Sequence, residues 1–120
     1  MASTQDLIET AVERSTDEVP ALAKLKLVFE LELRGRGDVQ LFRVEVPGPK
    51  ITKEMADDAR VTVEIVRSNF NELAADGTVK DYRRAWDEGH IKASGDPAIL
   101  KLIGQVIERH ELRAGTKKVR

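Results

Sequence analysis

The stretch from Asp58 to Arg109 constrains the fold more than any other part of the chain. Residues 59–66 alternate apolar and polar side chains, which predicts a strand with one buried face. Apolar residues then recur at helical spacing in two segments, and a glycine ends each of them, Gly77 and Gly89. The stretch therefore predicts a strand followed at once by two short helices.

Capping residues sharpen this prediction. Ser68 is the expected N-cap of the first helix, and Thr78 is the expected N-cap of the second, with Asp81 as its capping-box partner. Residues 91–93 then predict a short strand. Asp96-Pro97 predicts the start of a last helix, because aspartate caps well and proline fits the first helical position.

Two helices are predicted at the start of the chain. Residues 4–14 place apolar side chains at helical spacing, and Ser3 or Thr4 can cap that helix. Pro20 can open a short second helix.

A hairpin follows these helices. Residues 25–34 alternate cleanly, residues 35–38 contain two glycines and predict a tight turn, and residues 39–46 predict the return strand. The apolar face of the return strand changes phase near Leu41, so we expect either two partly covered faces or a bulge. Ile51 predicts a brief third strand.

Strands that form hairpins early and helices that gather late predict an α+β fold, with one mostly antiparallel sheet covered on one face. A chain of 120 residues fits one domain and can bury a core of its own. We expect that domain to span residues 1–112 and to be followed by a flexible basic tail at 113–120.

Composition excludes several classes of function. Lysine and arginine number 20 against 21 aspartates and glutamates, so charge gives no case for nucleic acid as a partner. Without cysteine there is no disulfide framework or thiol chemistry. The first residues lack the pattern of a signal peptide, and no apolar segment approaches the roughly 20 residues of a membrane span. We expect a cytoplasmic protein whose basic tail makes at most transient contact with an anionic membrane.

A set of short motifs in the second half carries a resemblance. In chain order they are Asp58-Ala59-Arg60-Val61-Thr62-Val63, Phe70 with Gly77, Trp86 with Gly89, Ile91 to Gly95-Asp96, and Leu100 with Ile103. In their order and spacing they resemble the C-terminal half of the sterol carrier protein 2 (SCP2) family. The resemblance implies a five-stranded sheet with helices packed on one face and a function located in an apolar cavity.

Apolar and aromatic side chains on the predicted late helices are the candidate ligand-binding residues. Ordinary core packing explains the same spacing, and the resemblance is what favours a cavity wall. Tyr82 and Trp86 also carry polar tips that can orient a head group. The candidates are Phe70, Leu73, Tyr82, Trp86, Leu100, Ile103 and Ile107.

We predict no catalytic residue, no metal site and no cofactor. His90 and His110 are the only histidines, and neither stands at a metal-ligand spacing. Asp57 and Asp58 are neighbours before a strand, where adjacent side chains point apart rather than converge on a reacting group. The tripeptide Arg36-Gly37-Asp38 reads as part of the hairpin turn.

The expected function is non-enzymatic binding, shielding and transfer of an apolar ligand such as a fatty acid, acyl-CoA or sterol. One alternative is a small enzyme that uses the same cavity for a cyclisation or isomerisation. A second alternative is a dimerisation or accessory module for a partner protein, with the cavity filled by core side chains.

Overall fold

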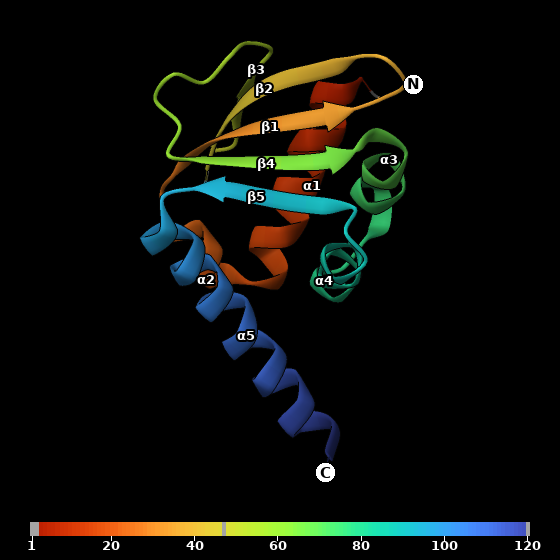
Figure 1. The fold of residues 1–120 in the computed structure, drawn as a ribbon. Coiled ribbons are helices and arrows are strands. Elements are labelled where there is room, and N and C mark those ends of the chain that lie inside the picture. Colours follow the sequence, from red (N-terminus) through yellow and green to blue (C-terminus); the bar gives the residue numbers. More distant parts are fainter. Residues whose placement is uncertain (1–2, 47, 120) are drawn as a thin grey trace.

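The computed structural model describes residues 3–46 and 48–119, with side chains described up to residue 113. Five helices and five strands make up these residues (Figure 1). Their order is α1 (Thr4–Glu18), α2 (Pro20–Ala23), β1 (Val28–Arg34), β2 (Val39–Glu45), β3 (Lys50–Thr52), β4 (Val61–Val66), α3 (Arg67–Asp76), α4 (Val79–Asp87), β5 (Ile91–Gly95) and α5 (Pro97–Val119).

The strands form a single sheet in the order β3-β2-β1-β4-β5. All neighbouring pairs are antiparallel except β1 and β4, which run parallel with Phe29 opposite Val61. The predicted α+β class, with five mostly antiparallel strands, is therefore confirmed. Helix α1 lies across one face of the sheet, and α5 leaves β5 and extends away from it (Figure 1).

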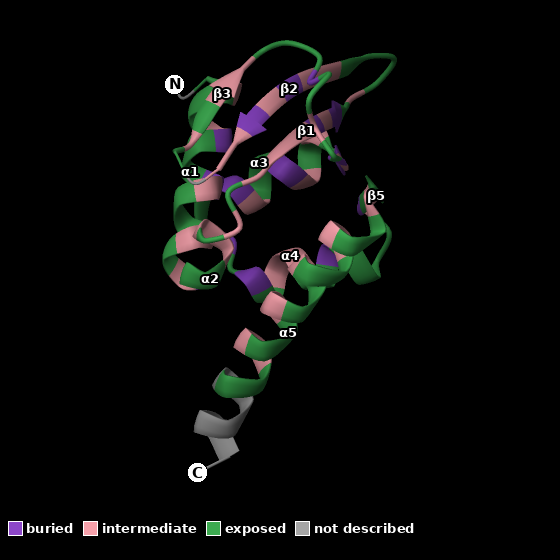
Figure 2. Ribbon diagram, turned by 90° about the vertical axis from the view of Figure 1, so that its left-hand side faces the viewer, coloured by how far each residue is buried: buried purple, intermediate pink, exposed green. Residues whose placement is uncertain are grey.

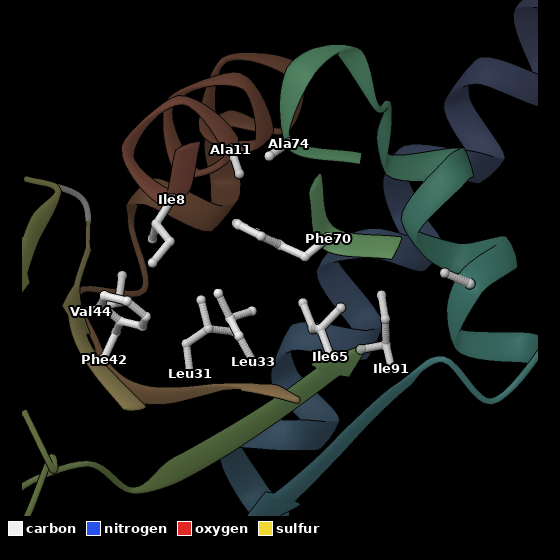
Figure 3. Packing of buried hydrophobic residues seen from close by; sticks show 11 residues of the cluster. Ile8, Ala11, Leu31, Leu33, Phe42, Val44, Ile65, Phe70, Ala74 and Ile91 are labelled. Atoms are coloured by element: carbon white, nitrogen blue, oxygen red, sulfur yellow. The ribbon is translucent and has the colours of Figure 1, made fainter. Parts of the chain in front are cut away.

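The core lies between that face and helices α1 and α3. Buried positions alternate with more exposed ones along β1 and β2, as the sequence alternation predicts (Figure 2). Figure 3 shows side chains from α1 and α3 meeting those of the strands. The buried residues of this core are Ile8, Ala11, Leu31, Leu33, Phe42, Val44, Ile65, Phe70, Ala74, Ala85 and Ile91.

Most predicted caps are confirmed. Ser3 and Asp6 form a capping box at α1, and Thr78 and Asp81 form another at α4. Asp96 accepts a hydrogen bond of 2.9 Å from the backbone N–H of Ala98 at the start of α5.

The prediction that Ser68 caps α3 is wrong. Strand β4 runs directly into α3, so Val66 takes the N-cap position and makes no side-chain hydrogen bond there. Ser68 lies inside the first turn, exposed to solvent. The serine matched the preferred residue type, but the extended backbone of Val66 already begins the helix two residues earlier.

No bulge interrupts the hairpin. The register runs without a break from Val28 opposite Glu45 to Arg34 opposite Val39. Leu41 is instead half-buried on the outer face of β2. This matches the alternative expectation, that both faces of the return strand are partly covered.

Helix α5 continues to Val119, past Arg113, where the sequence predicts a tail to begin. The side chains of residues 114–120 lie outside the described residues, so the flexibility of this segment stays a prediction.

Candidate functional site

A pocket of about 240 Å³ lies at the end of the core face where β1 and β4 begin. Its walls come from the sheet, from the second half of α1, from the α2 segment, and from one side chain each of α4 and α5. We call it the main pocket. Its lining residues are Ala11, Val12, Ser15, Thr16, Leu22, Leu25, Leu27, Phe29, Val46, Val61, Val63, Tyr82 and Ile103.

Short side chains form part of both the helix wall and the sheet wall of the main pocket. The second half of α1 presents Ser15 and Thr16, and the opposing strand β4 presents Val61 and Val63. None of these side chains reaches far enough to close the space between the helix and the sheet.

The main pocket is almost wholly apolar, with three hydroxyl groups among its lining side chains. Thr16 donates its hydroxyl proton to the backbone carbonyl of Val12 at 3.0 Å and is therefore satisfied. The hydroxyl oxygen of Tyr82 is buried and has no hydrogen-bond partner among the described residues. Burial raises the pKa of Tyr82 to about 12, with the Arg14 charge acting weakly in the opposite direction, so the phenol stays neutral at physiological pH.

A second pocket of about 330 Å³ adjoins the main pocket. The two pockets share Leu25, Leu27 and Val61 in their walls. The second pocket is more polar than the main one, because it adds three charged side chains to its apolar wall. Its remaining lining residues are Lys26, Val28, Asp58, Arg60, Ile99 and Leu102.

Two of these charges are neutralised by neighbours. Asp58 accepts two hydrogen bonds from the Arg43 guanidinium, at 3.0 Å to Nε and 2.7 Å to Nη2. That pairing holds the pKa of the Asp58 carboxyl below its usual range. Arg60 lies 3.2 Å from the Asp96 carboxylate.

The predicted ligand-binding residues divide among three environments. Tyr82 and Ile103 line the main pocket. Phe70 is buried in the core and Leu73 packs against it. Trp86 is 49% exposed on α4, whereas Leu100 and Ile107 are partly buried on α5.

Sequence reasoning missed most of the pocket walls. Leu22, Leu27 and Phe29 come from the first half of the chain, which the candidate set did not include. Their alternation marked Leu27 and Phe29 as inward-facing strand residues, but alternation does not distinguish a residue that faces a void from one that faces a neighbour.

No set of three or more His, Cys, Asp or Glu side chains gathers in a metal-binding arrangement within the described part of the chain. His110 Nε2 lies 3.3 Å from the Glu18 carboxylate, and His90 Nε2 lies 3.7 Å from that of Glu88. Among the helices in the described range, none is long and apolar enough to span a bilayer.

The sequence and the structure of this chain were compared with those of known proteins, and only the structure has matches. No family model and no curated protein matches the sequence. Among solved structures, the crystal structure of sterol carrier protein 2 like 2 (SCP2-L2) from Aedes aegypti is similar, with a TM-score of 0.57 and 24% identity over 88% of this chain and 98% of that one. The solution structure of palmitated SCP2L2 from the same organism gives a TM-score of 0.55 and 24% identity over 83% and 93%.

A third similar structure is the inverting sec-alkylsulfatase Pisa1 from Pseudomonas sp., with a TM-score of 0.53 and 18% identity over 82% of this chain. The chain spans only 14% of that enzyme's length. Because these identities are low, the likenesses establish the fold rather than the activity. The resemblance implied by the motif order is thus confirmed in three dimensions: this chain has the SCP2 fold.

Proposed function

We propose that the chain binds an apolar ligand in the main pocket, shields it from water and transfers it to an acceptor, as a cytoplasmic carrier. The observation that carries this proposal is the main pocket itself, whose walls are apolar apart from the hydroxyls of Ser15, Thr16 and Tyr82. Each ligand methylene removed from water there contributes about 0.8 kcal/mol to binding. Such a site needs no reacting side chain.

Pocket size narrows the ligand. An apolar cavity of about 150 Å³ is large enough to bind benzene. Pockets for drug-sized ligands begin near 300 Å³. At about 240 Å³ the main pocket suits part of an acyl chain better than a whole sterol ring system. The palmitated state of the similar Aedes aegypti protein is consistent with an acyl ligand here, whether a free fatty acid or an acyl-CoA.

Binding of a fluorescent fatty-acid analogue tests the proposal. We expect saturable binding of micromolar affinity and displacement by unlabelled fatty acid. The Ser15→Leu variant should weaken binding, because a larger side chain on the α1 wall occupies the main pocket. Ser68→Leu is the matched control, since it makes the same change on the exposed side of α3, outside the pocket.

A second function is favoured by one observation. The fold recurs as a small part of a much longer sulfatase chain, which is consistent with an accessory module that acts beside a catalytic partner. Wild-type protein that shows no saturable binding of fatty acids, acyl thioesters or sterols would contradict the carrier and support the module.

A further inference from the structure

The main pocket and the second pocket adjoin and differ in chemical character. Leu25, Leu27 and Val61 belong to both walls, so these three residues mark the boundary where the two pockets meet. The main pocket presents no charged side chain, whereas the second presents Lys26, Asp58 and Arg60 beside Ile99 and Leu102. Such a change from apolar to charged lining matches a ligand that has an apolar tail and a polar head.

The charges of the second pocket leave a positive excess. Asp58 is held by Arg43 at 2.7 Å, and Arg60 is paired with Asp96 at 3.2 Å. Lys26 is exposed and has no ion-pair partner among the side chains that the structure describes. An anion that enters the second pocket therefore meets one uncompensated ammonium group.

The backbone of Lys26 supports a specific role for this residue. Its φ of 46° places it in the left-handed region, which costs free energy for a residue with a Cβ atom. Lys26 stands between Leu25 and Leu27, the two leucines shared by both pockets. The unusual backbone geometry thus occurs at the junction of the two pockets.

We propose that the second pocket holds the anionic head group of a single-chain amphiphile, a carboxylate or a phosphate, with the Lys26 ammonium as its counter-charge. The tail of the same molecule lies in the main pocket, so this inference rests on the proposed function. It narrows the ligand class to anionic single-chain lipids over neutral ones such as sterols. The cation is exposed, so its attraction is partly screened by water and salt.

A matched set of ligands with one chain length separates head from tail: decanoate, decyl phosphate, decanol and decyltrimethylammonium, each measured by displacement of the neutral dye Nile red. We expect wild-type protein to bind an anion about fivefold more tightly than decanol at low salt, which is the effect of one cation near an anionic group. The carboxylate and phosphate arms show which anion is preferred. Raising the salt concentration should reduce the difference.

Three variants assign the preference to Lys26. Lys26→Gln keeps a polar side chain of nearly the same length but removes the charge, so it should bind decanoate and decanol equally. Lys26→Glu should favour decyltrimethylammonium over decanoate. Lys92→Gln removes the same charge from an exposed position on β5 outside both pockets and should behave like wild type.

The possible failures are distinguishable. Equal binding of all four ligands to wild type and variants would overturn the head-group site and leave the carrier standing. A preference for anions that survives Lys26→Gln would also overturn it. If none of the four ligands displaces Nile red from the wild-type protein, the proposed function fails and this inference fails with it. Equal denaturation midpoints of the variants show that the comparison is between folded proteins.

Discussion

The two ends of one sheet face differ in a way that sets where a ligand can go. The filled end contains Leu33, Ile65 and Phe70, of which Leu33 has no exposed surface. The hollow end contains Leu27 and Val63, which line the main pocket. The same two strands run through both ends: β1 follows directly after Leu27 and contains Leu33, and β4 contains Val63 and Ile65.

The helices that cover the sheet account for the difference. At the filled end, α3 places the Phe70 ring against the strand side chains, with Ala74 close by (Figure 3). At the hollow end, α1 presents the short side chains of Ser15 and Thr16. The cavity in this chain therefore depends on the size of the side chains that meet between helices and sheet, and not on the alternation of the strands alone.

The largest expected effect comes from truncating one leucine at each end. Leu33→Ala at the filled end should cost about 2–5 kcal/mol of unfolding free energy, because it leaves a void among close-packed neighbours. Leu27→Ala at the hollow end should cost less than that, because its side chain already borders an empty space. Chemical denaturation of both variants measures the difference, and equal losses would break the distinction between the two ends.

Truncation of Ile103 sharpens the comparison on the helix side. Ile103→Ala should cost about 1–2 kcal/mol, below the usual range for core isoleucines. Its affinity for a fluorescent fatty-acid analogue should fall by more than its stability does, since Ile103 lines the main pocket. A loss of stability as large as that of Leu33→Ala, with unchanged ligand affinity, would place Ile103 outside the site.

Removal of a single oxygen atom tests the hollow end without a change of shape. The buried Tyr82 hydroxyl has no hydrogen-bond partner among the described residues, so Tyr82→Phe removes a desolvated group that gains nothing in the folded state. We expect the variant to be as stable as wild type or more stable by up to about 1 kcal/mol. A clear fall in the thermal midpoint would show that the hydroxyl has a partner in solution.

The smallest effect concerns Asp58 in the second pocket, beside the hollow end, and depends on pH. The Arg43 hydrogen bonds lower the pKa of Asp58, so its contribution to stability is present above the ordinary carboxyl pKa and is lost as the pH falls below that value through the lowered pKa of the folded state. Asp58→Asn should therefore narrow the difference in denaturation midpoint between about pH 6 and about pH 3. An unchanged pH profile in the variant would show that the exposed pair contributes nothing measurable.

Much of this fold was predictable from the sequence, since local signals determine it. The capping box of Thr78 and Asp81 and the glycine that follows α3 fix helix ends within a few residues. The prediction of Ser68 as the N-cap of α3 was wrong because β4 enters α3 without a loop, so the helix begins before the preferred cap residue.

The site was less predictable, for a physical reason. Tyr82 and Ile103 carry the same helical spacing as Phe70, yet Phe70 fills the core and the other two line the main pocket. Periodicity reports which way a side chain faces, whereas a void depends on the combined volume of side chains from distant elements. The pattern therefore predicted that Leu27 and Phe29 face inward, but it could not predict that they line a void.

The parallel pairing of β1 with β4 has a kinetic consequence. The strands β1, β2 and β3 follow one another in the chain and can pair locally, whereas β4 and β5 arrive later with two helices between them. Phe29 and Val61, which face each other across this junction, are both pocket walls, so the pocket cannot exist before the two segments join. Loop closure over such a distance comes late and costs entropy. A ligand of the main pocket should accordingly slow the unfolding rate of the native protein and leave its refolding rate nearly unchanged.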